Sequence, residues 1–162
     1  PPETLEELRA AARRSDTRRR GASMASGRML SKKELTERLT KKGASPDDAA
    51  ETADWLEDLG AVDDTAYAGV IVRHYGAMGC GAARVRQELH RRGVPKELWD
   101  EALKQLPPPQ EAIEKFLCAK LRGRPLTPED SRRLAAALQR RGFSWQDIRP
   151  ILNGLGQEID ET

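Results

Sequence analysis

The chain has 162 residues, of which 33% are charged and 4% are aromatic. This length suits one medium domain or an array of small repeats, and it excludes two large catalytic domains. Lys and Arg number 28 against 26 Asp and Glu, so the formal charge of +2 does not by itself indicate a nucleic-acid-binding protein. Apolar stretches are only a few residues long and predict no membrane-spanning helix. Two cysteines are too few for a disulfide framework, so we expect a cytoplasmic protein.

The first 29 residues are expected to lie outside the repeated part of the chain. Residues 3–12 predict a short helix, because Thr4 and Glu7 have the spacing of a capping box. Residues 13–28 are rich in Arg, Ser and Gly. We expect this second segment to be mobile.

The remainder of the chain repeats itself three times. Each copy contains a leucine, one polar residue, two basic residues and a glycine. The glycines are Gly43, Gly93 and Gly142, which lie 50 and 49 residues apart. A nearly constant period of this length is typical of a repeat protein. We therefore expect repeats over 30–62, 63–106 and 107–155, followed by a C-terminal tail over 156–162.

The residues around each glycine predict a helix, a tight turn and a second helix. An apolar pair four residues apart precedes each glycine, as in Leu35 and Leu39, and forms one helix face. The basic pair falls in the last turn, where cations favour the negative end of the helix dipole. Glycine then takes the left-handed conformation that ends a helix. Ser45 and Ser144 are expected to cap the helices that follow.

A third helix precedes this pair in at least two of the repeats. Residues 64–75 have apolar residues spaced as one helix face, and so do residues 111–121, which follow three consecutive prolines. Cys118 is expected on the apolar face of the latter helix, as a small core residue. The predicted fold is all-α, an elongated array of three tandem three-helix repeats with little or no β-structure.

No stretch of the sequence predicts catalysis. The glycine-rich segment 79–84 lacks the third glycine of a dinucleotide-binding motif, and Ala82 stands where a P-loop needs lysine. Asp63 and Asp64 are interpreted as helix-capping residues, because no His or third acid lies at a useful spacing for a paired-carboxylate site. We expect no enzyme, no metal and no cofactor. The His and Cys residues of the chain have a spacing that matches no zinc module; they are His74, Cys80, His90 and Cys118.

The basic pairs are the remaining candidates for function. If the repeats stack, equivalent positions face the same way and the pairs align along one surface. Such a row would follow a phosphate backbone or an acidic protein groove. The alternative is that the pairs are solvated helix ends that only complement helix dipoles. The residues concerned are Lys41, Lys42, Arg91, Arg92, Arg140 and Arg141.

The central part of the chain resembles the RecX family of bacterial recombination regulators. The resemblance covers about residues 30–153 and is strongest over 79–93, a glycine-rich segment followed by a basic helix. Residues 59–68 resemble the family's segment leading into the second repeat, and residues 31–35 resemble the opening of the first repeat's middle helix. The family also has an Ala/Leu-rich helix before that opening, which the composition of 13–28 does not match.

The resemblance implies an elongated helical protein that binds the RecA recombinase filament. Such a protein would inhibit the ATPase, strand-exchange and coprotease activities of RecA, and would bind single-stranded or duplex DNA weakly. We expect a monomer that contacts no membrane. The candidate residues in the matched central motif are Arg84, Arg86, Arg91 and Arg92, and Lys41, Lys42, Arg140 and Arg141 occupy equivalent repeat positions.

Two other functions remain open from the sequence. A helix, a glycine turn and a helix are also the parts of a helix-turn-helix DNA-binding regulator. The helices after the glycines are apolar and acidic, however, which suits base edges poorly. The second alternative is a helical protein–protein scaffold with no link to nucleic acid.

Overall fold

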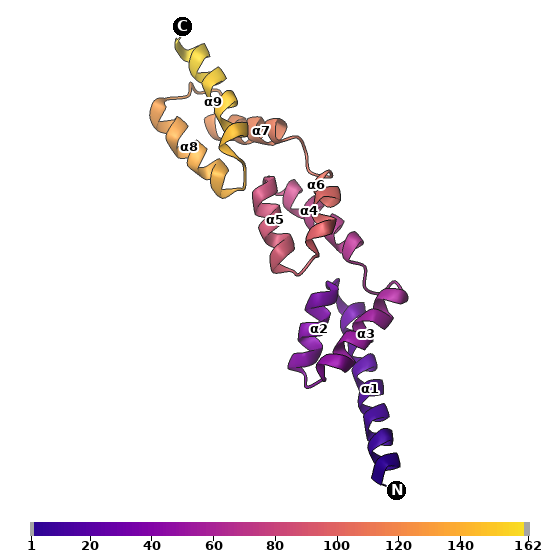
Figure 1. Cartoon of the computed structure of the whole chain (residues 1–162). Coiled ribbons are helices and arrows are strands. Elements are labelled where there is room, and N and C mark those ends of the chain that lie inside the picture. Colours follow the sequence, from indigo (N-terminus) through magenta and orange to yellow (C-terminus); the bar gives the residue numbers. More distant parts are fainter. Residues whose placement is uncertain (1, 161–162) are drawn as a thin grey trace. The chain divides into compact units, whose positions relative to one another are not determined.

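A computed structural model describes residues 2–160 of the chain, and the side chains of residues 3–156 (Figure 1). Its described part contains nine α-helices, one short 3-10 helix and no strand. The all-α prediction is therefore confirmed. The helices are α1 (Pro2–Gly27), α2 (Lys32–Lys41), α3 (Pro46–Asp58), α4 (Asp64–Ala77), α5 (Ala82–Arg91), α6 (Trp99–Leu103), α7 (Pro109–Leu121), α8 (Pro128–Arg140) and α9 (Trp145–Asp160), with the 3-10 helix at Lys96–Leu98.

The described residues form two compact units. The first contains the described residues up to 68 together with 90–98, and the second contains 69–89 together with the described residues from 99 onwards. The division falls inside the segment expected to form the second repeat, since both α4 and α5 contribute residues to each unit. The boundaries between the three repeats remain a sequence prediction.

The expectation of a short N-terminal helix and a mobile segment is wrong, because α1 runs unbroken over Pro2–Gly27. Thr4 consequently lies inside the first turns of α1 and not at its cap. Gly21 is buried, and a Cβ added to it would lie 2.6 Å from Thr52 Cγ2 on α3. Arg18 pairs with Glu51 at 2.6 Å. The small and basic residues thus allow α1 to approach α3 closely and to pair with its acids, which the composition alone does not reveal.

The core of the first unit lies among α1, α2 and α3, which contact one another in pairs (Figure 1). The predicted pair Leu35 and Leu39 is buried there. Ser45 caps α3, as predicted, and Ser31 caps α2 in a reciprocal box with Glu34. The buried apolar residues of this core are Leu30, Leu35, Leu39, Ala49, Ala53, Leu56 and Val62.

The core of the second unit lies among α7, α8 and α9, and α9 contacts both of the other helices. Leu134 and Leu138 are buried in it, as their spacing predicts. Cys118 is exposed, so its expected place in the core is wrong. It follows Leu117 directly, and one residue turns a helix by about 100°, so Cys118 lies to the side of the buried row Ile113, Leu117 and Leu121. The main buried residues are Ile113, Leu117, Leu121, Leu126, Leu134, Leu138, Phe143, Ile148 and Leu152.

All three repeated glycines have the backbone conformation that the sequence predicts. The φ angle is +101° at Gly43, +77° at Gly93 and +101° at Gly142. This left-handed region is costly for residues with a Cβ, and it allows the chain to leave the helix after the basic pair.

Candidate interaction surface

The glycine turns connect helix ends in the same way in both units. In the first unit, the Ser31 hydroxyl at the start of α2 donates a hydrogen bond to the carbonyl of Arg92 at the end of α5. In the second unit, the Gly81 amide before α5 donates to the carbonyl of Arg141 at the end of α8, at 2.8 Å. The positive end of one helix therefore meets the negative end of another, which is electrostatically favourable.

The two junctions are tightly packed at their glycines. A Cβ added to Gly93 would lie 2.8 Å from Lys33 Cβ, and one added to Gly142 would lie 2.4 Å from the Arg84 backbone nitrogen. The amide of Ala83 also donates to the carbonyl of Gly142 at 3.1 Å. At Gly142 another backbone approaches too closely for any side chain, whereas at Gly93 the close neighbours are the side chains of Lys33 and Ser31.

The junctions bring cations from different helices near each other. Arg84 packs against Gly142, the residue that follows Arg140 and Arg141. Lys33 packs against Gly93, the residue that follows another basic pair. Lys33 is not among the site residues predicted from the sequence. The sequence shows that Lys33 lies two residues after the helix-capping Ser31. It does not show which glycine turn packs against the start of that helix, because that contact is tertiary.

Two of the predicted site residues take part in packing. The Arg92 guanidinium donates to the Tyr67 hydroxyl at 3.1 Å. The Arg141 guanidinium lies 4.7 Å from the centre of the Phe116 ring and donates to the Met78 carbonyl at 3.4 Å. Both side chains are half-buried, so each is held in one place and presents only part of its charge to solvent.

The other predicted cations are exposed. Arg84 and Arg86 lie on α5 on either side of the buried Val85, and neither has an ion-pair partner in the described part of the chain. Arg91 is exposed too and interacts within the structure. The remaining exposed members are Lys41, Lys42 and Arg140.

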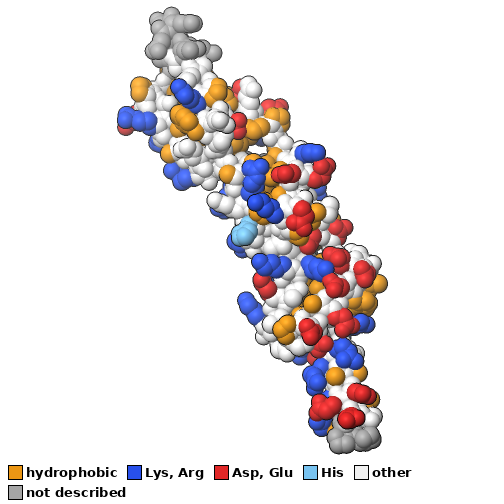
Figure 2. Space-filling model, viewed as in Figure 1, with side chains coloured by type: hydrophobic (Ala, Val, Ile, Leu, Met, Phe, Trp, Pro, Cys, Tyr) orange, Lys and Arg blue, Asp and Glu red, His pale blue; other side chains and the backbone are white. Residues whose placement is uncertain are grey.

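Acidic side chains gather over α3 in the first unit (Figure 2). Lys32 reaches them from α2, with ion pairs to Asp54 at 2.5 Å and Glu57 at 3.3 Å. The hydrogen bond to Asp54 is the main cause that raises the pKa of Lys32. Charge on this unit is therefore segregated, since α3 is acidic while the end of α2 carries the basic pair.

The two acids before α4 have different structural roles. Asp63 accepts a hydrogen bond from the Ala66 amide at 3.1 Å, which confirms its predicted capping role. Asp64 accepts one from the Lys32 amide at 2.9 Å and so joins α4 to α2. Burial is the largest cause that raises the pKa of Asp64. Among the described residues, no group of three or more His, Cys, Asp or Glu is placed to hold a metal ion.

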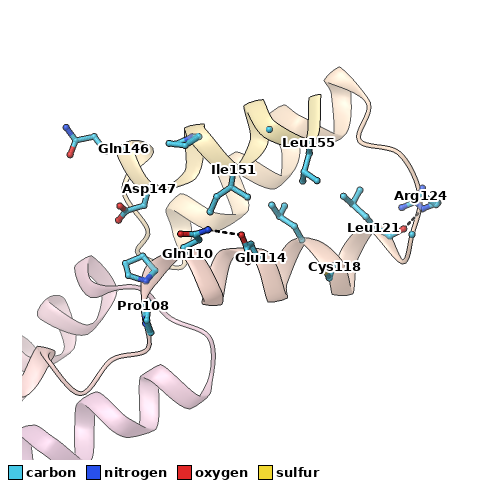
Figure 3. Close-up of a pocket in the computed structure, with 15 residues that line it drawn as sticks. Pro108, Gln110, Glu114, Cys118, Leu121, Arg124, Gln146, Asp147, Ile151 and Leu155 are labelled. Atoms are coloured by element: carbon cyan, nitrogen blue, oxygen red, sulfur yellow. Dashed lines mark hydrogen bonds between the residues drawn. The ribbon is translucent and has the colours of Figure 1, made fainter. Parts of the chain in front are cut away.

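A separate groove of about 910 Å³ lies between α7 and α9 (Figure 3). Leu121, Ile151 and Leu155 line it. The Glu114 carboxylate accepts a hydrogen bond from the side-chain amide of Gln110 at 3.1 Å. Arg124, a basic residue of the lining, donates a hydrogen bond from Nε to the Leu121 carbonyl at 3.2 Å. The groove is thus mainly apolar and contains none of the predicted site residues.

No helix in the described part of the chain is long and apolar enough to cross a membrane.

Comparison with known proteins identifies the relatives of this chain. Residues 63–103 match the family model for the second three-helix domain of RecX. Regulatory protein RecX from Chromohalobacter salexigens is 34% identical over 123 residues, which cover 75% of this chain and 81% of that protein. The chain belongs to the RecX family.

Other comparisons agree with membership of the RecX family. Regulatory protein RecX from Xanthomonas citri is 33% identical over 121 residues, covering 74% of this chain and 75% of that protein. The crystal structure of RecX from Lactobacillus salivarius has a TM-score of 0.77 at 22% identity, covering 94% of this chain and 99% of that one. This structural similarity shows a common fold. The predicted family is therefore confirmed, and the RecX model covers four of the site residues: Arg84, Arg86, Arg91 and Arg92.

Proposed function

We propose that this RecX-family chain binds the RecA recombinase filament and inhibits its ATPase, strand-exchange and coprotease activities. It would act by binding and not by catalysis, as a monomer without a cofactor. The observation that carries the proposal is the pair Arg84 and Arg86, which is exposed, without ion-pair partners in the described structure, and inside the segment matched to the family. Cations in this state keep their charge available for a partner.

The structure of the junctions supports a binding role for these cations. Arg84 belongs to a backbone segment fixed by the hydrogen bonds of Gly81 and Ala83, so the backbone that carries its side chain is in place before a partner binds. Binding that requires little ordering loses less affinity to conformational entropy. The partner would be an acidic protein surface or DNA phosphate, and several weak contacts on one filament would add up through avidity.

The direct test is the ATPase activity of RecA on single-stranded DNA with and without this chain. We expect inhibition at a several-fold excess of the chain, and we expect Arg84→Glu/Arg86→Glu to lose most of it. A matched control is Arg132→Glu/Arg149→Glu, which makes the same charge change at exposed positions of α8 and α9. The far-ultraviolet circular dichroism of all three proteins should agree. Absence of inhibition by the unmodified chain would refute the proposal.

The two alternatives predict different outcomes. A helix-turn-helix regulator should protect a specific DNA sequence in footprinting, yet α6, which follows the Gly93 turn, has only five residues, including Asp100 and Glu101. A scaffold without a nucleic-acid link should keep its binding when Arg84 and Arg86 are reversed in charge. The short, acidic α6 therefore argues against the helix-turn-helix regulator, and the charge-reversal variant separates the scaffold from the filament regulator.

A further inference from the structure

A second groove, of about 810 Å³, lies in the second unit beside the α5–α8 junction. It is formed by the end of α4, the segment that leads into α7, and one face of α7. Apart from Arg141, none of the residues that line it is one of the predicted site residues. The lining residues used below are Arg73, Met78, Phe116, Lys115, Lys120 and Arg141.

The base of this groove is apolar. Phe116 is half-buried in it, and Met78, which is 57% exposed, presents an apolar side chain to the groove. Ala112 and Ala119 of α7 complete the surface. Methionine is flexible and polarizable, so it adapts to apolar groups of different shapes.

The rim of the groove is cationic. Four basic side chains line it in the described structure, against one acid, Glu111. Arg73 is held by a hydrogen bond of 2.6 Å to Gln105. Lys115 is exposed and has no ion pair within the described part of the chain. The rim therefore presents an excess of positive charge around an apolar base.

Two glycines, one in the last turn of α4 and one just after it, shape the groove. A Cβ on Gly79 would lie 2.9 Å from an Arg141 guanidinium nitrogen, and a Cβ on Gly76 would lie 3.0 Å from Leu106. Glycine at 79 allows Arg141 to cross the turn and to reach Phe116. Residues 76–79 are thus part of this surface.

We propose that this groove binds an acidic peptide segment of a partner protein, one in which Asp or Glu residues alternate with aliphatic ones. The aliphatic side chains would lie on Met78 and Phe116, and the carboxylates would pair with the rim cations. Charge complementarity of this kind fixes register and speeds association. The proposal is carried by the groove alone and does not depend on the identity of the partner as RecA.

The aromatic ring favours a peptide over single-stranded nucleic acid. Bases bind to such proteins by stacking on exposed aromatic rings. In this groove both Lys120, at 5.7 Å, and Arg141, at 4.7 Å, already lie over the ring of Phe116. A stacked base would have to displace a cation, whereas an aliphatic side chain beside the ring would not.

The test is fluorescence anisotropy with the intact chain and a short fluorescein-labelled peptide made of Asp, Glu, Leu and Ala. We expect saturable binding that weakens with salt, and no binding of the peptide whose acids are replaced by lysine. Lys115→Glu/Lys120→Glu should weaken binding about tenfold or more, because like charges would then face each other. Met78→Asp should weaken it as well.

The control is Arg132→Glu/Arg149→Glu, which makes the same charge change at exposed positions of α8 and α9 outside the groove and should bind the peptide normally. Equal binding by the groove variants and the unmodified chain, or no binding by the latter, would overturn the proposal. Competition by an oligothymidylate that is lost in the same groove variants would identify a nucleic-acid site and also overturn it. Failure here leaves the ATPase result unaffected, so the two proposals fail separately.

Discussion

Substitution of the repeated glycines by alanine measures how much the junctions contribute to the fold. Gly43 and Gly142 occupy equivalent positions and share the same φ of +101°, so the backbone cost of a Cβ is the same at both. Among the described residues, a Cβ on Gly43 meets no heavy atom within 4 Å. A Cβ on Gly142 would lie 2.4 Å from the Arg84 nitrogen and 2.9 Å from the Gly81 carbonyl oxygen. The difference between the two variants isolates the junction.

The expected magnitudes follow from these contacts. Gly43→Ala should lower the free energy of unfolding by about 1–2 kcal/mol, the cost of a left-handed residue with a Cβ. Gly142→Ala adds overpacking against backbone atoms, of about 1–3 kcal/mol, and weakens two hydrogen bonds of about 1 kcal/mol each. Its total should be about 4–7 kcal/mol. Gly93→Ala should fall between them, because the nearest atoms that a Cβ there would meet belong to side chains, Lys33 Cβ at 2.8 Å and Ser31 Oγ at 3.1 Å, and not to the backbone.

The assay is urea unfolding followed by circular dichroism at constant temperature, with the three variants compared with the unmodified chain. The predicted order of destabilisation is Gly43→Ala, then Gly93→Ala, then Gly142→Ala. Equal losses at Gly43 and Gly142 would show that the α5–α8 contact contributes nothing, and would refute the reasoning about the junctions.

Three further predictions concern the two cores and a half-buried acid. Leu138→Ala should cost about 2–5 kcal/mol in urea unfolding because Leu138 is fully buried, whereas Leu8→Ala, at a side chain that is 63% exposed, should change stability by less than about 0.5 kcal/mol. Gly21→Val should detach α1 from α3 and speed hydrogen exchange of the amides in α1; unchanged exchange would contradict the observed packing. The raised pKa of Asp64 means that its contribution to stability is greatest below the usual value of 3.8 and is lost as pH rises through the folded-state pKa. Asp64→Asn keeps an acceptor for the Lys32 amide but has no carboxyl group to ionise. The midpoint of thermal unfolding of this variant, minus that of the unmodified chain, should therefore increase as pH rises from about 3 to 7. A difference that stays constant with pH would count against this assignment.

Local features of the fold could be predicted because local sequence causes them. Gly43, Gly93 and Gly142 end helices through their own backbone freedom, and the paired leucines follow helical periodicity. The helix over 13–27 could not be predicted in the same way. Its stability comes from tertiary contacts, such as Gly21 against Thr52 and Arg18 with Glu51, which override a composition typical of a mobile segment.

The candidate surface was only partly predictable for a related reason. Arg84 and Arg86 could be selected from the sequence because they lie in the segment that resembles the family. The packing of Arg92 on Tyr67 and of Arg141 on Phe116 joins residues far apart in the chain, so no local pattern reveals it. The same holds for Lys33, whose place beside Gly93 depends on which helix start meets which turn.

Co-sedimentation with RecA filaments on single-stranded DNA tests the central claim most directly. The unmodified chain and the Arg132→Glu/Arg149→Glu control should both pellet with the filaments, and Arg84→Glu/Arg86→Glu should remain in the supernatant while keeping its helical content. Equal pelleting of all three proteins, or failure of the unmodified chain to pellet, would contradict the claim that these α5 cations contact the filament.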